Sequence, residues 1–333
     1  MNTTYPIKVS VLMLAYNQQD YIDEAIRSVV LQRTAFAFEL IVADDASTDA
    51  TAEHIARWQQ RYPDIVRVLP RQANLGLARN FIRAYREARG EYIAVCEADD
   101  FWTDSRKLQR QADFMDSHKE YAMCFHRVVN YYQADGSKSL SNGGQRRTVT
   151  IRELAMCNPI TNVAVFYRHA LVPELPEWMP EVTSYDFVMH MLCACHGDIY
   201  YMRRPMAVYR KLATSIWTGG DQARRSMISL RNRDLLIGYF ESRDAEVCRL
   251  LRTANAQKLL ELSLYYAAQG DTDKEQQTLR DIARYRPDWT EADLSRELAR
   301  MQTATHAPSP LRRMLTALRR TVSRLLPLPR VSG

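Results

Sequence analysis

Two short clusters of acidic residues are the part of the sequence best suited to chemistry. The first is DDASTD at 44–49 and the second is EADDFW at 97–102, and each follows a run of apolar residues typical of a buried strand. A helix cap accounts for one acid in such a turn, but carboxylates this close repel one another unless a cation or donors compensate them. The clusters therefore predict a site for a divalent cation and the phosphates that it binds.

Other phosphate-binding and metal-binding motifs are missing from the sequence. The segment AYNQQDY at 15–21 contains neither GxGxxG nor GxxxxGK[ST], which argues against a dinucleotide-binding enzyme and a P-loop kinase. The six cysteines form no CxxC pair, so we expect free buried thiols. Cys193, Cys195 and His196 lie in an apolar helical stretch, where packing is a better interpretation than metal binding.

The elements that would position the acids alternate between strands and helices through the first hundred residues. Strands are predicted at 8–16, 39–44, 65–70 and 91–100, and helices at 20–32, 47–61 (capped by Ser47 or Thr48) and 77–88. This alternation predicts the α/β class, with a mixed, mainly parallel sheet and helices on both faces. Ligands bind such sheets at the carboxyl ends of the strands, where both acidic clusters fall.

The pattern changes after residue 120. We predict a strand at 121–132, an exposed loop at 135–147, a short helix at 150–157, a strand at 162–167, a helix at 184–196 and two short strands around Pro205. From 221 onward the pattern is helical in about four segments, and 264–289 resembles one tetratricopeptide-type hairpin. The predicted organisation is a catalytic domain at 1–220, a helical region at 221–305 and a basic tail at 306–333.

The net charge of +6 comes from that tail. Six of the 45 basic residues and none of the 39 acidic residues lie in 301–333, so the other 300 residues are neutral overall, which disfavours a nucleic-acid partner. At 308–330, apolar residues follow helical spacing and arginines occupy the other face, which favours a helix on an anionic membrane surface. A helix docked on the protein itself and a disordered basic end are the alternatives.

Four segments in this order resemble a family-2 glycosyltransferase of the GT-A fold. They are VSVLMLAYNQQDYIDEAIRSVVLQ, ELIVADDASTDAT, NLGLARN and GEYIAVCEADDFW, and the resemblance covers about residues 7–215. It implies transfer of a sugar from a nucleotide-sugar donor, assisted by a divalent metal such as Mn²⁺ or Mg²⁺, commonly with inversion at the anomeric carbon.

The resemblance also implies roles for the donor-binding residues. Tyr16, Asn17, Asp44 and Asp45 match the nucleobase and ribose pocket, with Asp45 accepting a hydrogen bond from the base. The positions that close over the base and support the diphosphate correspond to Asn74 and Arg79, and Gly76 between them would either let the backbone approach the nucleotide or serve as a turn glycine.

The metal motif and the catalytic base follow from the same resemblance. Glu97, Ala98 and Asp99 correspond to the family's DxD motif, with Asp99 as the metal ligand and Glu97 on the ribose or a metal-bound water. Asp186 matches the general base for the acceptor hydroxyl, although a helix N-terminus with Ser184 as the cap is the alternative interpretation.

A third stretch, AVYRKLATSIW at 207–217, resembles the family's YRxH motif. Arg210 suits a diphosphate because it stays charged, and Tyr209 and Trp217 are further candidates for diphosphate and acceptor contacts. Leu212 stands where a histidine often completes the metal site. This departure implies either that the metal has one or two protein ligands or that metal dependence is weakened.

These observations predict an inverting hexosyl- or N-acetylhexosaminyltransferase that uses a UDP-sugar and a glycan or lipid-linked acceptor in bacterial surface polysaccharide synthesis. Acceptor choice is expected to lie in 127–183. No apolar run is long enough to span a bilayer and the N-terminus lacks a secretory signal, so we expect a cytoplasmic protein, peripheral at the inner face of the membrane. The alternatives are a sugar-nucleotide pyrophosphorylase, which would need a Gly-rich first loop, and a non-catalytic scaffold of a glycan-assembly complex.

Overall fold

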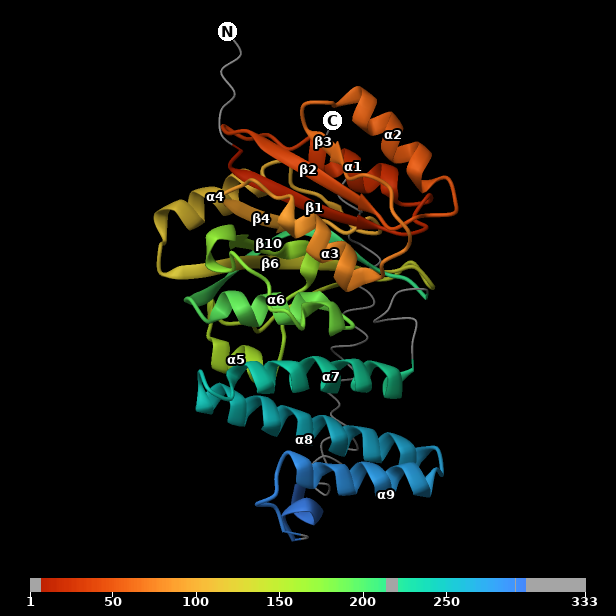
Figure 1. Cartoon of the computed structure of the whole chain (residues 1–333), viewed down its shortest axis with the longest axis vertical. Coiled ribbons are helices and arrows are strands. Elements are labelled where there is room, and N and C mark those ends of the chain that lie inside the picture. The colour runs from red at the N-terminus through yellow and green to blue at the C-terminus, as the bar shows by residue number, and fades with distance from the viewer. Residues whose placement is uncertain (1–6, 214–220, 291, 298–333) are drawn as a thin grey trace. The chain divides into compact units, whose positions relative to one another are not determined.

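The chain folds into two compact units, each described below by itself (Figure 1). The computed structural model describes residues 7–213, 221–290 and 292–297. The sheet unit contains the described residues up to Leu154 together with Pro159–Lys211. The helical unit contains Ala155–Asn158 and the described residues from Leu212 onward. The predicted membrane helix at 308–330 and Trp217 lie outside the described residues.

The sheet unit is built on one mixed sheet. Its described strands run in the order β3-β2-β1-β4-β9-β6-β10-β5, with β7 beside β6 and β8 beside β10. The strands are β1 (Val9–Ala15), β2 (Phe38–Asp44), β3 (Val66–Val68), β4 (Tyr92–Val95), β5 (Phe101–Trp102), β6 (Tyr121–Tyr132), β7 (Lys138–Leu140), β8 (Thr148–Val149), β9 (Phe166–Arg168) and β10 (Asp198–Lys211). Strands β1 to β4 pair in parallel, as β6 does with β10. The predicted α/β class is confirmed.

Helices pack against this sheet because its central strands are apolar on both faces. All seven residues of β1 and of β2 are buried, so neither face of these strands meets solvent. Helices α3 and α6 contact each other, as do α1 and α2. The helices along this part of the chain are α1 (Ile22–Val30), α2 (Thr51–Arg61), α3 (Leu77–Arg86), α4 (Lys107–Ser117), α5 (Ile151–Met156) and α6 (Tyr185–Ala194).

A glycine sets how closely the start of β4 approaches β1. A Cβ atom on Gly90 would lie 2.4 Å from the Ser10 nitrogen, so no other residue fits there without moving the backbone. The Ser10 hydroxyl accepts a hydrogen bond from the Gly90 nitrogen and donates one to buried Glu39. Arg67 and Arg89 form ion pairs with Glu39. Near the start of β4, two arginines therefore neutralise the buried carboxylate of Glu39.

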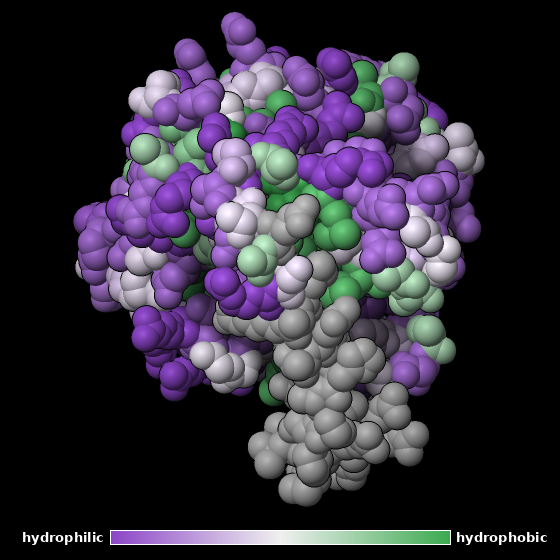
Figure 2. Space-filling view, turned by 90° about the horizontal axis from the view of Figure 1, so that it is seen from below, coloured by the Kyte–Doolittle hydropathy of each residue, from purple (hydrophilic) through white to green (hydrophobic). Residues whose placement is uncertain are grey.

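The helical unit contains three long helices that lie side by side in Figure 1. They are α7 (Gln222–Phe240), α8 (Ala245–Ala268) and α9 (Thr272–Asp281), and the side chains of Asp221, Asp244 and Asp271 cap their N-termini. The predicted helical region is confirmed. Within the described residues, no helix is both long and apolar enough to cross a bilayer. The face of the molecule shown in Figure 2 is mostly hydrophilic and surrounds a smaller hydrophobic area.

Several sequence predictions need correction. Residues 198–211 form one strand, β10, and not two short strands. The register of β10 against β6 shifts on either side of Pro205, so the strand continues past a residue that cannot donate a backbone hydrogen bond. Helix α2 begins at Thr51 with Ala50 as the N-cap residue, so neither Ser47 nor Thr48 caps it. The predicted exposed loop contains β7, which pairs with β6.

Two further predictions were wrong in part. The predicted strand at 162–167 opens as a 3₁₀ turn, η1 (Asn162–Ala164), and only its end joins β9. All six cysteines are free, but Cys157 and Cys195 are exposed rather than buried. Within the described residues, no group of three or more His, Cys, Asp or Glu is arranged to hold a metal ion.

Candidate active site

The parallel register of β1, β2 and β4 brings the two acidic clusters to one edge of the sheet. Ala15 pairs with Asp44, and the Asp45 nitrogen donates to the Ala15 carbonyl oxygen at 2.9 Å. On the other side of β1, the Ala98 nitrogen donates to the Leu14 carbonyl oxygen at 3.3 Å. The residues that follow these three strands therefore meet at the carboxyl edge, where ligands bind in sheets of this type.

The carboxylate of Asp45 is held by backbone donors from the turn before α3. Its two oxygens accept hydrogen bonds from the nitrogens of Leu75 (2.8 Å) and Gly76 (2.9 Å). The Asn74 amide donates to the Asp45 carbonyl oxygen at 3.0 Å. Gly76 has φ +78°, a backbone conformation that favours glycine. A Cβ atom added to Gly76 would meet nothing within 4 Å, so this conformation, and not steric crowding, accounts for a glycine at this position.

The rest of the first cluster is equally well satisfied. The Asp44 carboxylate accepts hydrogen bonds from the Ser47 nitrogen and hydroxyl. The same hydroxyl accepts one from the Asn17 nitrogen at 2.9 Å, and the Asn17 side-chain oxygen accepts one from the Thr48 nitrogen at 2.8 Å. Asn17 (φ +53°) and Ala46 (φ +63°) both adopt the left-handed conformation, which is rare for Ala and marks a tightly specified turn.

Two of the predicted donor contacts lie at the surface beside this turn. Tyr16 directly follows β1 and is 48% exposed, which leaves its ring open to a ligand. Arg79 is exposed on α3, whereas Arg83, one turn further along the helix, donates to the carbonyl oxygens of Pro70 (2.9 Å) and Asp44 (3.3 Å). Arg83 thus supports the turn, and Arg79 remains open to a ligand.

The second cluster is not compensated in this way. Burial, together with the negative charges of Asp99 and Asp186, raises the pKa of Glu97 to about 8. Burial raises the pKa of Asp99, although the charge of Arg210 opposes the change. Asp100 is fully buried, and burial together with the charges of Asp99 and Glu97 raises its pKa well above the usual value. Four carboxyl groups thus act on one another here, three from 97–100 and one from α6.

Hydrogen bonds to this cluster come from residues that the sequence did not single out. The Glu97 side chain accepts hydrogen bonds from the Asn162 amide (3.1 Å) and the Tyr185 hydroxyl (3.3 Å), and Asn162 also donates to that hydroxyl at 2.7 Å. The Tyr185 ring stacks on Phe81 of α3 at 3.9 Å. Asn162 and Tyr185 are far from Glu97 in the sequence and belong to no motif that indicates this contact, so only the fold shows that they bond to Glu97.

Asp186 lies in the first turn of α6 and is partly exposed. Ser184 is the N-cap residue, but its hydroxyl accepts no hydrogen bond from the helix backbone and donates instead to the Asp186 carboxylate. The alternative interpretation, in which Ser184 serves as a side-chain cap, therefore gains no support. Asp186 is close enough to Glu97 for its charge to raise the pKa of that residue. The carboxylate thus faces the acidic cluster.

Arg210 is already engaged within the protein. It is only 6% exposed, its guanidinium pairs with Glu24 of α1 and donates to the Asp99 carbonyl oxygen at 2.5 Å, and its nitrogen donates to one Asp100 carboxylate oxygen at 2.8 Å. The guanidinium also lies over the ring of Phe101, 4.6 Å from its centroid. These contacts order the turn of the second cluster.

Behind this turn lies a buried cation. Lys107 is completely buried, lies over the Trp102 ring at 4.0 Å and donates to the Gln111 side chain at 2.8 Å. Gln111 donates to the Ala164 carbonyl oxygen at 3.1 Å and the Trp102 indole to the Val163 carbonyl oxygen at 3.2 Å. This network holds η1, whose first residue bonds Glu97. Burial lowers the pKa of Lys107 to about 7.

The acids fit a divalent cation only if the substrate supplies most of its ligands. No described group of three or more acids, histidines or cysteines could hold a metal by itself, and Leu212 replaces the usual histidine. One Asp100 carboxylate oxygen is buried without a hydrogen-bond partner in the described structure. Mg²⁺ sites commonly use one or two carboxylates plus substrate phosphates.

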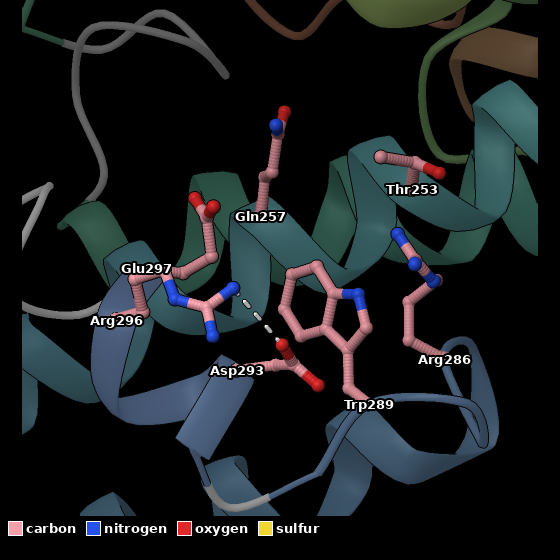
Figure 3. A pocket seen from close by; sticks show the side chains of 7 residues that line it. All are labelled: Thr253, Gln257, Arg286, Trp289, Asp293, Arg296 and Glu297. Atoms are coloured by element: carbon pink, nitrogen blue, oxygen red, sulfur yellow. Dashed lines mark ion pairs between the residues drawn. The ribbon is translucent and has the colours of Figure 1, made fainter.

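A separate pocket in the helical unit has different chemistry. Figure 3 shows Trp289 among polar side chains from α8 and the segment after α9, with Asp293 and Arg296 joined in an ion pair at 3.2 Å. The Arg286 guanidinium lies over the Trp289 ring at 4.6 Å and pairs with Asp288. None of the predicted donor or catalytic residues lines this pocket, so it is not part of the candidate active site.

Comparison with known proteins agrees with the geometry of the sheet unit. Residues 10–171 match the family described as Glycosyl transferase family 2. A relative in Mycobacterium tuberculosis, Uncharacterized protein Rv1520, is 38% identical over 229 residues, which are 68% of this chain and 65% of that protein. The dTDP-rhamnosyl transferase RfbG of Shigella flexneri is 29% identical over 140 residues, 41% of this chain and 47% of that protein. The chain thus spans less than two thirds of either relative.

Solved structures show the same fold. Staphylococcus aureus TarS 1–349 in complex with UDP-GlcNAc aligns with a TM-score of 0.55 at 18% identity, over 86% of this chain and 93% of that one. The mannosyltransferase PcManGT of Pyrobaculum calidifontis, in complex with GDP-Man and Mn²⁺, aligns with a TM-score of 0.56 at 16% identity, over 97% of this chain and 88% of that one. The fold is that of the GT-A glycosyltransferases, and within this fold residues 10–171 match glycosyl transferase family 2.

Proposed function

We propose that this protein is an inverting, metal-assisted glycosyltransferase that takes its sugar from a nucleotide-sugar donor, with a UDP-sugar as the expected donor. The observation that carries the proposal is the acidic cluster at 97–100, whose buried carboxyl groups raise one another's pKa and lie close to Asp186 at the carboxyl edge of the sheet. Acids held together against their mutual repulsion favour a ligand that brings positive charge. A divalent cation bound to a nucleoside diphosphate has that charge.

In this proposal the first cluster holds the nucleoside and the second holds the diphosphate. The compensated turn at 44–49 is rigid, and Tyr16 and Asn17 border it. Asp99 would be the protein ligand of a divalent cation, which would supply positive charge as the diphosphate leaves. Glu97, fixed by Asn162 and Tyr185, would accept hydrogen bonds from the donor ribose or a bound water.

Asp186 would remove the proton from the acceptor hydroxyl. Its carboxylate is partly exposed at the edge of the acidic cluster and is oriented by Ser184. Deprotonation as the acceptor oxygen attacks the anomeric carbon makes one in-line displacement, which inverts that carbon. A positioned general base contributes about 10²–10⁴-fold to the rate.

The acceptor and the location of the protein belong to the same proposal. We propose a glycan or lipid-linked acceptor in bacterial surface polysaccharide synthesis, and the similarity to the dTDP-rhamnosyl transferase RfbG supports the transfer of a sugar. We further propose a catalytic domain at 1–220, a helical region at 221–305 and a basic tail whose segment 308–330 binds anionic lipid at the cytoplasmic face of the membrane. If a truncation after Thr305 still sedimented with anionic vesicles, the tail would not be the membrane anchor.

Donor hydrolysis tests the enzymatic proposal. UDP-, GDP- and dTDP-sugars are incubated with the full chain, with and without Mn²⁺ or Mg²⁺, and the released nucleoside diphosphate is measured. We expect release from one nucleotide class, dependent on the cation and reduced in Asp99→Asn. If no donor is bound or hydrolysed in any condition, the protein is a non-catalytic scaffold and the proposal fails.

A further inference from the structure

We infer that Lys211, rather than Arg210, is the side chain that contacts the donor diphosphate. This inference rests on the proposed function and assigns a further residue to it. Among the described residues near the acidic cluster, two cations come from the end of β10, and their neighbours on the strand show which one is available to a ligand.

The first step is the alternation of side chains along β10. Successive residues of a strand point to opposite faces, so Tyr209 and Lys211 share one face and Arg210 lies on the other. On its own face, Arg210 pairs with Glu24 of α1 and lies over the rings of Phe101 and Tyr21. Its charge is therefore already used within the protein.

The end of β10, which carries Tyr209 and Lys211, lies beside the acids. Strand β5 runs antiparallel to β10, with Phe101 opposite Val208, so the chain just before β5 runs back along Tyr209 and Arg210. The hydrogen bond from the Arg210 nitrogen to the Asp100 carboxylate, at 2.8 Å, fixes this alignment. Burial raises the pKa of Tyr209, and the charges of Asp100, Glu97, Asp99 and Asp186 raise it further. Tyr209 is therefore close enough to the cluster for the charges of these acids to act on its hydroxyl.

The third step concerns Lys211 itself. It lies two residues beyond Tyr209, about 6.6 Å further toward the carboxyl edge where the diphosphate would sit. Its ammonium lies over the Tyr209 ring at 3.8 Å and forms no ion pair or hydrogen bond with any residue in the described part of the chain. Burial lowers the pKa of Lys211 to about 8, and the nearby Asp100 opposes that change. A half-buried cation with no fixed partner is well suited to a phosphate oxygen.

Nucleotide affinity tests this assignment without an acceptor. UDP, GDP and dTDP are titrated by calorimetry into the full chain with Mn²⁺, and the one that binds is compared with its monophosphate. We expect Lys211→Met to weaken diphosphate binding about 10- to 100-fold, the range for one charge-assisted hydrogen bond, and monophosphate binding less than threefold. Lys211→Arg should recover most of the loss, and Lys119→Met, which removes an exposed lysine after α4, should bind as the wild type does.

Each outcome separates the inference from the proposed function. If the wild type binds a diphosphate and Lys211→Met binds it equally well, Lys211 has no contact with it and the inference is wrong. If diphosphate and monophosphate weaken to the same extent, the lysine supports the fold rather than the diphosphate, and the inference is also wrong. If the wild type binds none of the three nucleotides, the proposed function fails and the assignment of Lys211 fails with it. Thermal unfolding of each variant checks that it is folded.

Discussion

The two acidic turns at the edge of the sheet look alike in sequence and differ in physics. In the turn at 44–49, backbone nitrogens and a hydroxyl satisfy the carboxylates of Asp44 and Asp45. In the turn at 97–100, burial and the repulsion of neighbouring acids raise the pKa of Glu97 and of Asp100, and one oxygen of Asp100 has no partner in the described structure. The hydrogen bonds of the first turn are complete within the protein, and we propose that a ligand completes those of the second.

The difference comes from which segments reach each turn. Donors for Asp45 come from the turn before α3, some 30 residues later in the chain. In the second turn, the described donors to the three acids are the Asn162 amide and the Tyr185 hydroxyl on Glu97 and the Arg210 nitrogen on Asp100. A turn of this second kind is costly to fold without its ligand, which is typical of sites that bind a cation.

Asp186→Asn should reduce glycosyl transfer by about 10²–10⁴-fold, because the amide cannot take the acceptor proton. Donor binding should change little, since the amide has the same shape and Asp186 does not hold the nucleotide in this account. Steady-state kinetics and calorimetry measure the two quantities. If the transfer rate of the variant stayed within a factor of three of the wild-type rate, Asp186 would not be the general base.

Asp45→Ala should lower the free energy of unfolding by about 2 kcal/mol, because it leaves the Leu75 and Gly76 nitrogens without their acceptor. Chemical denaturation measures the change. Asp64→Ala, at an exposed position before β3, is the control and should stay within about 0.5 kcal/mol of the wild type. Equal stability of the two variants would mean that the first turn is not held by its carboxylate.

Lys107 extends the comparison to a buried cation with no ion-pair partner among the described residues. Its pKa is about 7 in the folded protein, against about 10.5 when unfolded, so between these values only the unfolded state holds the proton. Stability should therefore rise with pH in this interval, by at most about 1.4 kcal/mol per pH unit, relative to Lys107→Met. Denaturation of both proteins at pH 7.5 and 9 checks this, and parallel curves would contradict it.

Asp99→Asn should have the smallest effect on stability, with the opposite sign to Asp45→Ala. Removing one of several mutually repelling charges should raise the free energy of unfolding by about 1 kcal/mol in the absence of metal. Denaturation in a chelating buffer measures it. A loss of stability as large as that of Asp45→Ala would show that the second turn is compensated after all.

The positions of the two turns could be predicted from the sequence because runs such as 8–16 and 39–44 are apolar throughout, and parallel strands carry the following residues to one edge. The same approach failed at Pro205, where a register shift keeps β10 continuous. It also placed the start of α2 too early, because Ser47 bonds Asp44 instead of the helix.

The partners of the site residues could not be predicted, since they depend on which side chains the fold brings together. No local sequence pattern indicates that Asn162 and Tyr185 donate hydrogen bonds to Glu97. Likewise, nothing in the first turn of α1 indicates that Glu24 forms an ion pair with Arg210. The alternation of β10 would have separated Lys211 from Arg210 had residues 198–211 been interpreted as one strand.

The most direct test of the central claim is the effect of Mn²⁺ on nucleoside diphosphate binding. Calorimetry of UDP and GDP with the wild type and Asp99→Asn, each with Mn²⁺ and with a chelator, measures that effect in both proteins. We predict that Mn²⁺ strengthens binding to the wild type at least about 10-fold, equivalent to 1.4 kcal/mol, and has no effect on Asp99→Asn. An equal effect of Mn²⁺ on both proteins, or no effect on either, would contradict the account.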